Sequence, residues 1–228
     1  MSVLFKREDG VFTSNRSDAH HVDPSDVLAV ARSVSSRVPG QFFVGTAQHE
    51  SGFVVNERDS GDQGDGTDSD GIFQLSRSEA IKSGHPAADL FDLGDAATVF
   101  AILMHRNLDR ILSAAGNSSY PPGDVWAYLA MSHNQGIGAV EDSIRKFGLN
   151  YSGPGGYRER NKNTVKPGFN GPNIIAYCDD VISGGKSWRF EWNDLPPPDP
   201  DVDVLDPVSG LPILLAVVAA GFLFWRLS

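Results

Sequence analysis

Glu50 is the residue of this 228-residue chain whose position best suits acid–base chemistry. It follows Phe43 and Ala47 at helical spacing, so it would point the same way as two apolar side chains. Gly52 would end this helix, which places Glu50 in the last turn, where the helix dipole is negative. Burial and the dipole both favour the protonated carboxylic acid, the form that a general acid requires. The same placement also suits a glutamate that only hydrogen-bonds a loop.

Three short blocks accompany this acid along the chain. They read QHESGF at 48–53, GIFQLS at 71–76 and MSHNQGIGAV at 131–140. In this order they resemble the signature blocks of the lytic transglycosylase and goose-type lysozyme superfamily, which are Glu-Ser, Gly-Leu-Met-Gln and Ala-Tyr-Asn-Ala-Gly. The resemblance covers residues 24–187, where the late Tyr177 also matches an aromatic position of the family.

The resemblance implies a role for each matched residue. Glu50 would be the catalytic acid, and Ser51 the helix-terminal residue beside it. Gly71 and Gln74 would lie in a lobe that faces the acid, with Gln74 contacting the saccharide or bracing the cleft. Asn134 would open the next helix and either hydrogen-bond an N-acetyl group or orient Glu50.

The third block departs from the family pattern at Ser132 and His133, where Ala-Tyr is usual. His133 would then present a polar edge to the substrate in place of a tyrosine hydroxyl, and Tyr177 would be a further substrate-binding residue. His133 and His49 could be considered as metal ligands, but no further Cys or His stands at ligand spacing. We therefore expect neither a metal nor another cofactor.

The Asp/Gly-rich stretch at 59–71 allows two interpretations. Asp62 lies in a Gly-Asp-Gln-Gly segment that resembles Gly-Asp-Arg-Gly of goose-type lysozymes, where the aspartate is thought to hold the attacking water. Alternatively, Gly71 could match the glycine of an EF-hand loop, with Asp68 and Asp70 as ligands. That alignment puts Gly66 and Arg77 where carboxylates are needed, so the EF-hand match is incomplete and calcium binding stays open.

The substrate that the resemblance implies is peptidoglycan, at the β-1,4 bond between N-acetylmuramic acid and N-acetylglucosamine. Glu50 would protonate the leaving oxygen, as glycosidic cleavage requires. Without a second carboxylate, the muramic acid's own C6 hydroxyl would close a 1,6-anhydro ring, which is the transglycosylase outcome and the one we favour. With Asp62 about 6.5–9.5 Å from Glu50, inverting hydrolysis would follow. A chitin-directed hydrolase and a non-catalytic, membrane-tethered glycan-binding scaffold are the rival hypotheses.

Apolar residues at helical spacing predict that the body of the chain is mainly α-helical. Asp23 and Pro24 form a helix start, and a second helix runs from near Pro39 to Gly52. Further helices are expected at 95–115, 124–131, 137–147 and 173–182, with an irregular or hairpin lobe at 56–76. The resemblance makes this a lysozyme-like (α+β) fold.

The two ends of the chain differ from its body. Residues 194–207 contain five prolines and five aspartates and predict an extended tether. Residues 211–225 are all apolar, glycine or proline, and 208–227 would be about 30 Å long as a helix, enough to cross a bilayer. We therefore expect an N-terminal arm at 1–22, a lysozyme-like domain at 23–193, a linker at 194–207 and a transmembrane anchor at 208–227.

Composition narrows the partners and the location. The net charge of −10 argues against a nucleic-acid partner, and the single cysteine, Cys178, excludes an intramolecular disulfide. Residues 1–10 carry too short an apolar run for a secretory signal. An anchored wall-degrading enzyme without a leader is consistent with the virion membrane of a membrane-containing bacteriophage. The alternative is the host inner membrane, reached by another export route.

Overall fold

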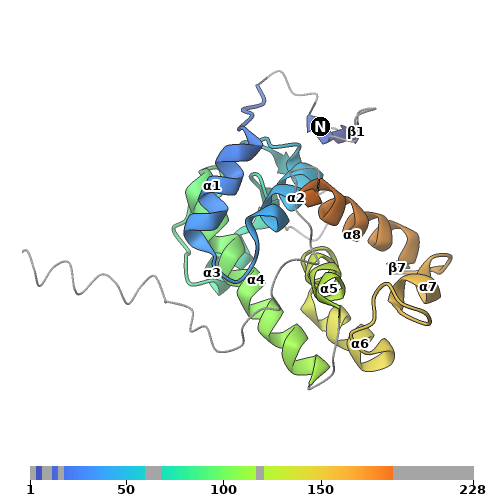
Figure 1. The fold of residues 1–228 in the computed structure, drawn as a ribbon. Coiled ribbons are helices and arrows are strands. Elements are labelled where there is room, and N and C mark those ends of the chain that lie inside the picture. Colours follow the sequence, from blue (N-terminus) through green and yellow to red (C-terminus); the bar gives the residue numbers. More distant parts are fainter. Residues whose placement is uncertain (1–3, 7–11, 15–17, 60–67, 117–120, 187–228) are drawn as a thin grey trace, which may run out of the picture. The chain divides into compact units, whose positions relative to one another are not determined.

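The computed structural model of this chain describes residues 4–6, 12–14, 18–59, 68–116 and 121–186, and most of these residues are helical (Figure 1). The chain divides into two compact units, Met1–Pro198 and Asp199–Ser228, and every described residue belongs to the first. The helices of this described part are α1 (Pro24–Val34), α2 (Gly40–Ser51), α3 (Arg77–Lys82), α4 (Leu93–Ala115), α5 (Pro122–Gln135), α6 (Ile137–Phe147), α7 (Tyr157–Asn161) and α8 (Gly171–Lys186). The mainly α-helical fold class is therefore confirmed.

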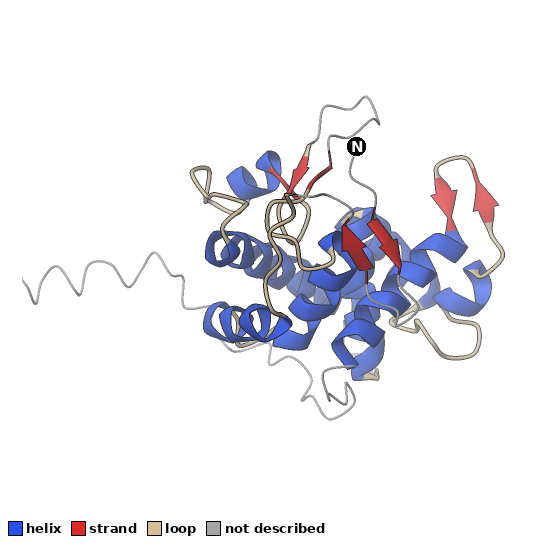
Figure 2. Cartoon of the chain, turned by 90° about the horizontal axis from the view of Figure 1, so that it is seen from above, coloured by secondary structure: helices blue, strands red, loops and turns tan. Residues whose placement is uncertain are grey.

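Short strands lie in three separate groups around the helices (Figure 2). All three groups are antiparallel. They are the pair β1 (Leu4–Lys6) and β2 (Phe12–Ser14), the three-stranded sheet β3 (Arg58–Asp59), β4 (Ser69–Asp70) and β5 (Leu75–Ser76), and the pair β6 (Val165–Lys166) and β7 (Phe169–Asn170). The three-stranded sheet occupies the stretch where the sequence predicted a small irregular or hairpin lobe.

Local signals account for the ends of the first two helices. Asp23 caps α1, because its Oδ1 accepts a hydrogen bond from the Ser25 backbone N–H at 2.8 Å, and Pro24 fills the first helical position. Pro39 precedes α2, and Gly52 ends it in the left-handed conformation with φ of 62°. Both predicted helices are thus confirmed, including the position of Glu50 in the last turn of α2.

Two predicted boundaries differ from the structure. The long helix α4 begins two residues earlier than expected, because Asp92 accepts hydrogen bonds from the backbone N–H groups of Gly94 and Asp95. Asn134 does not open a helix: α5 continues through it to Gln135. The break falls at Gly136, whose φ of 77° is a conformation that suits glycine, and α6 begins after it.

The last residues of the expected N-terminal arm are hydrogen-bonded to the body. Val22 N–H donates to the Phe53 carbonyl at 3.0 Å, and Val55 N–H donates to the His20 carbonyl at 3.0 Å. His20 N–H also donates to the Asn56 Oδ1 at 2.8 Å. The segment that precedes α1 is therefore tied to the chain that immediately follows α2.

Helix α2 runs through the core, with α1 and α8 against it. All of its residues from Gly40 to Ala47 are buried. A Cβ atom on Gly184 of α8 would lie 3.2 Å from the Cα atom of Gly45, so the two helix backbones approach closely. This contact holds the end of α2, and with it Glu50, against α8.

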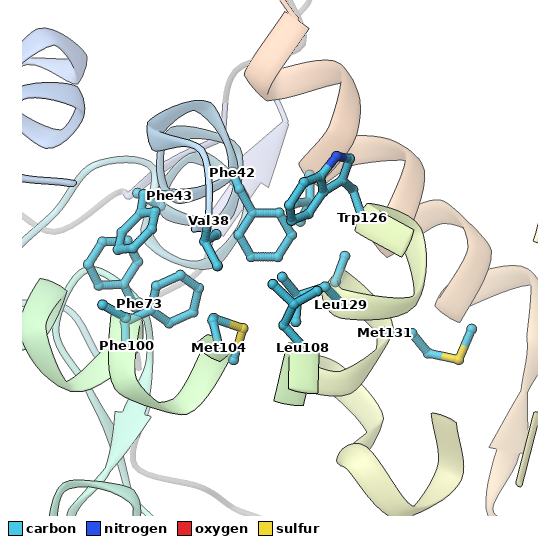
Figure 3. Packing of buried hydrophobic residues seen from close by; sticks show 14 of the residues in the cluster. Val38, Phe42, Phe43, Phe73, Phe100, Met104, Leu108, Trp126, Leu129 and Met131 are labelled. Carbon is cyan, nitrogen blue, oxygen red and sulfur yellow. The ribbon is translucent and has the colours of Figure 1, made fainter. Parts of the chain in front are cut away.

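Aromatic rings from three segments of the chain pack together in the core (Figure 3). Phe73 and Phe100 are stacked with ring centroids 4.6 Å apart, and Phe43 meets Phe100 edge to face at 5.0 Å. All three side chains are buried. The rings join α2, the turn before β5 and α4 into one rigid platform.

His105 makes the stability of the fold depend on pH. Burial, and then the positive charge of Arg37, lower the pKa of His105 from 6.5 to about 4, and its Nε2 lies 2.9 Å from Ser35 Oγ. Below pH 6.5 the His105 side chain binds a proton in the unfolded chain but not in the folded chain. The folded state therefore becomes less stable relative to the unfolded state as the pH falls from 6.5 toward 4. We expect the free energy of unfolding to drop by about 2–3 kcal/mol over this range from this group alone.

Denaturant unfolding at pH 7 and pH 4.5 tests this expectation. His105→Gln keeps a neutral polar group near Ser35 but cannot titrate, so the pH-dependent loss of its stability should be smaller than that of the unsubstituted chain. Equal losses in the two proteins would show that His105 does not carry the effect.

Among the described residues, no helix is both long and apolar enough to cross a membrane. The expected linker at 194–207 and the expected anchor at 208–227 lie outside the described residues.

Candidate functional site

The Glu50 carboxyl group lies where three helices meet. Its side chain, in the last turn of α2, keeps 19% of its surface exposed. Oε1 accepts a hydrogen bond from the Tyr177 hydroxyl of α8 at 2.7 Å, and it lies 3.5 Å from His133 Nε2 of α5. Both contacts are to the same oxygen, so this half-buried acid is held by one oxygen while the other takes no hydrogen bond from a described side chain.

His133 connects Glu50 to the second sequence block. Its Nε2 lies 3.0 Å from the Phe73 carbonyl oxygen, which can only accept, so the proton of the neutral ring must sit on Nε2. Nδ1 is buried and has no hydrogen-bond partner among the described residues, which agrees with that tautomer. The side chain is only 6% exposed and its ring meets Phe100 edge to face at 5.2 Å. The structure therefore places a largely buried His133 beside the Glu50 carboxyl group, and its contact with a substrate stays a prediction.

Tyr177 is buried and acts as a hydrogen-bond donor. Burial, and then the neighbouring charge of Glu50, raise the pKa of Tyr177 well above its ordinary value. The hydroxyl thus stays protonated at any physiological pH and continues to donate to Glu50. The ring is itself positioned by His49, which packs edge to face against it at 4.6 Å.

If Glu50 is the catalytic acid that the sequence resemblance implies, removing the Tyr177 hydroxyl should slow catalysis without unfolding the chain. We expect Tyr177→Phe to reduce kcat about tenfold, because Glu50 loses its one short side-chain hydrogen bond and its fixed orientation. The measurement is the rate of release of soluble fragments from purified cell walls. Tyr151→Phe is the matched control, since this buried tyrosine makes no hydrogen bond to Glu50. Equal rates for the two variants would contradict this role of Tyr177.

The turn Gly71–Gln74 is built around a glycine that cannot be replaced without a clash. Gly71 is buried with φ of 76°, and a Cβ atom there would lie 1.8 Å from the Leu90 carbonyl oxygen. Its carbonyl accepts from the Gln74 backbone N–H at 3.1 Å and from Gln74 Nε2 at 2.8 Å. Gly71 and Gln74 therefore shape the turn that presents the Phe73 carbonyl to His133. One amide N–H of the Gln74 side chain is already bonded within this turn.

Left-handed backbone conformation marks two of the three sequence blocks. Among the described non-glycine residues, Phe53 and Gln74 have a positive φ, 66° and 50° respectively. Such conformations cost about 1–2 kcal/mol and persist where the surrounding structure enforces them, often at functional sites. They occur three residues after Glu50 and in the turn that contacts His133, which is consistent with a functional role of this region.

Ser51 has no free hydrogen-bonding capacity directed at the surface. It is fully buried, its Oγ donates to the Ala47 carbonyl at 3.0 Å and accepts from the Val54 backbone N–H at 3.2 Å. These bonds close the end of α2 and fix the chain after it. Ser51 thus positions the last turn that carries Glu50.

A pocket of about 900 Å³ lies beside this cluster. We call it the glycan pocket, after the ligand that the sequence resemblance implies. Tyr177 lines this pocket, and its hydroxyl donates a hydrogen bond to the Glu50 carboxyl group. Asn134 is exposed at the pocket, and its Oδ1 accepts from Gln135 Nε2 at 2.6 Å. His49 also lines the pocket. Further lining residues belong to the hairpin β6–β7 and to the first turns of α8, including Phe169, Asn170 and Asn173.

Two other expectations concern the Asp/Gly-rich stretch. Asp62, the candidate for holding a water, lies in the segment 60–67, which is outside the described residues. Asp70, a candidate calcium ligand, is described: its Oδ1 accepts from Arg58 Nε at 2.8 Å, a salt bridge across β3 and β4. In the part of the chain that the structure describes, no group of three or more His, Cys, Asp or Glu side chains could hold a metal ion.

Sequence reasoning missed the hairpin β6–β7, which forms one wall of the glycan pocket. Its two-residue strands are too short for an alternating pattern to be visible. The Pro167-Gly168 pair between them was the available signal, since this dipeptide is typical of a turn and Gly168 has φ of 73°.

Comparison with protein-family models and with curated proteins found no match to this chain.

Proposed function

We propose that this chain is a peptidoglycan lytic transglycosylase of lysozyme-like fold, with Glu50 as its general acid and base. One observation carries the proposal: the three sequence blocks and Tyr177 come together around the carboxyl group of Glu50. These segments are far apart in the chain, yet Tyr177 and His133 both contact Glu50 Oε1, and His133 in turn contacts the Phe73 carbonyl.

The contacts of Glu50 support different roles for its two carboxyl oxygens. Tyr177 and His133 hold Oε1, so Oε2 of Glu50 is the oxygen that we expect to exchange the proton with the substrate. Protonated Glu50 would give its proton to the glycosidic oxygen as the bond from C1 of N-acetylmuramic acid breaks. The C6 hydroxyl oxygen of the same sugar would then bond to C1, and its proton would pass to Glu50. The acid is thereby restored and the product is a 1,6-anhydro sugar.

The glycan pocket has the chemistry that an N-acetylated saccharide needs. Its volume falls in the range of about 300–1,000 Å³ that is usual for ligand sites. Asn134, Asn170 and Asn173 bring amide groups that can pair with N-acetyl and hydroxyl groups, while Phe169 and Tyr177 supply apolar ring surface. Asn134 would serve substrate binding from the end of α5.

The proposed place of action is a membrane next to a bacterial cell wall. The apolar run at 211–225 would anchor the chain, and the Pro/Asp-rich stretch at 194–207 would let the catalytic body reach the glycan. We propose the virion membrane of a membrane-containing bacteriophage, with the host inner membrane as the alternative.

Digestion of purified sacculi by the full chain, followed by mass spectrometry of the released muropeptides, tests the function. We expect anhydro products, which weigh one water less than reducing products. Reducing ends would instead identify a hydrolase, and Asp62→Asn should then cause a large loss of activity. Binding to sacculi without any released muropeptide would contradict an enzymatic function and favour the glycan-binding scaffold.

A further inference from the structure

A second pocket, of about 670 Å³, lies between α6, α7 and the hairpin β6–β7. Three of its lining residues carry a positive charge, Lys146, Arg160 and Lys166, while Asp142 is the one described acid in its lining. We call it the basic pocket. A local excess of positive charge is unusual in a chain whose net charge is −10, and it favours an anionic ligand.

The cations of the basic pocket have no acidic partner among the described residues. Asp142 is paired with Arg145, which does not line the pocket. Lys146 Nζ lies over the Phe147 ring at 5.0 Å and Lys166 Nζ over the Phe169 ring at 5.4 Å, so both ammonium groups are kept near the lining. All three charged side chains remain exposed and able to bind a negative group.

The two aliphatic hydroxyl groups of this lining already donate within the protein. Ser143 Oγ donates to the Ala139 carbonyl at 2.8 Å, and Thr164 Oγ1 donates to the Arg160 carbonyl at 3.3 Å. The ammonium and guanidinium groups of Lys146, Arg160 and Lys166 are the charged donors that face a ligand here. Such a lining suits a carboxylate better than an uncharged sugar.

The basic pocket adjoins the glycan pocket. Lys166 and Phe169 line both, so the same short hairpin borders the two pockets. A ligand part that leaves the glycan pocket past β6–β7 would meet the three cations. In peptidoglycan the groups attached to the sugars are short stem peptides that carry free carboxylates.

We propose that the basic pocket binds a carboxylate of the stem peptide on the glycan strand that occupies the glycan pocket. This inference rests on the proposed function and adds to it a preference for peptide-bearing glycan. Lys146 and Arg160 are the residues that would distinguish such a substrate, because Lys166 is shared with the glycan pocket.

Equilibrium binding by the full chain tests the inference. The background is Glu50→Gln, which prevents turnover, and the probes are a soluble disaccharide–tetrapeptide and the same disaccharide without peptide. We expect Lys146→Gln/Arg160→Gln to weaken binding of the peptide-bearing probe about fivefold, with no change for the bare disaccharide. The loss should shrink as salt rises, because exposed charge pairs are screened.

The matched control is Lys82→Gln/Lys162→Gln, which removes two exposed positive charges that line neither pocket. Equal weakening by both double variants, or equal weakening for both probes, would overturn the inference. So would displacement of the peptide-bearing probe by inorganic phosphate at matched ionic strength, which would indicate a phosphate site. Failure of the proposed function is observed separately, as the absence of any muropeptide released from sacculi by the unsubstituted chain.

Discussion

Glu50→Gln will remove catalysis while leaving the fold intact. Glutamine has nearly the same shape, and its amide oxygen can still accept the Tyr177 hydrogen bond, but it has no proton to give to a leaving oxygen. We expect the rate of muropeptide release to fall by about 10²–10⁴ or more, the usual contribution of general acid–base catalysis. The unfolding midpoint, measured in parallel, should change little.

Glu141→Gln provides the control for this substitution. Glu141 is a carboxylate on α6 that pairs with Arg110 at 2.7 Å, and among the described residues it makes no hydrogen bond to Glu50, His133 or Tyr177. Its loss should leave the rate of muropeptide release within about twofold of the unsubstituted chain, since an exposed pair contributes little. A folded Glu50→Gln chain that lyses cell walls as fast as the control would remove Glu50 from the mechanism.

Gly71→Ala will be the most destabilising of the substitutions considered. The added Cβ would lie 1.8 Å from the Leu90 carbonyl oxygen, a backbone atom that cannot turn aside, and φ of 76° is unfavourable for alanine. Left-handed strain costs about 1–2 kcal/mol and overpacking about 1–3 kcal/mol, so we expect a loss of about 3–4 kcal/mol in the free energy of unfolding. Denaturant unfolding measures this loss directly.

Gly84→Ala separates the clash from the backbone strain. Gly84 has a similar φ of 86°, but an added Cβ atom there meets nothing within 4 Å. It should therefore lose only about 1–2 kcal/mol. If the two alanine variants are equally stable, the close approach of Gly71 to Leu90 is not what holds the turn.

The activity of Gly71→Ala is also informative. A shifted turn would move the Phe73 carbonyl away from His133, whose Nε2 contacts both this carbonyl and Glu50. We therefore expect the folded fraction of this variant to be slower than the unsubstituted chain, whereas folded Gly84→Ala should keep full activity.

Local sequence determined the elements that carry the acid. The cap at Asp23, the proline before α2 and the glycine after it act within a few residues, so the helix ends could be predicted without knowing the fold. The same holds for the placement of Glu50 in a final helical turn. Two helix boundaries were predicted less well, because more than one nearby residue could cap or end the helix. They are the start of α4 at the Asp92 cap and the end of α5 at Gln135.

Tertiary structure alone decided what surrounds Glu50. The hydroxyl that donates to it comes from Tyr177, 127 positions later in the chain, and the buried tautomer of His133 depends on a backbone carbonyl 60 positions earlier. No pattern in the sequence encodes a distance between such residues, because side-chain periodicity reports only which face of one element is apolar. The close packing of α8 against α2 at Gly184 helps to set the distance between Tyr177 and Glu50. Glu50 could therefore be predicted from the sequence, whereas its hydrogen-bond partners follow only from the tertiary structure.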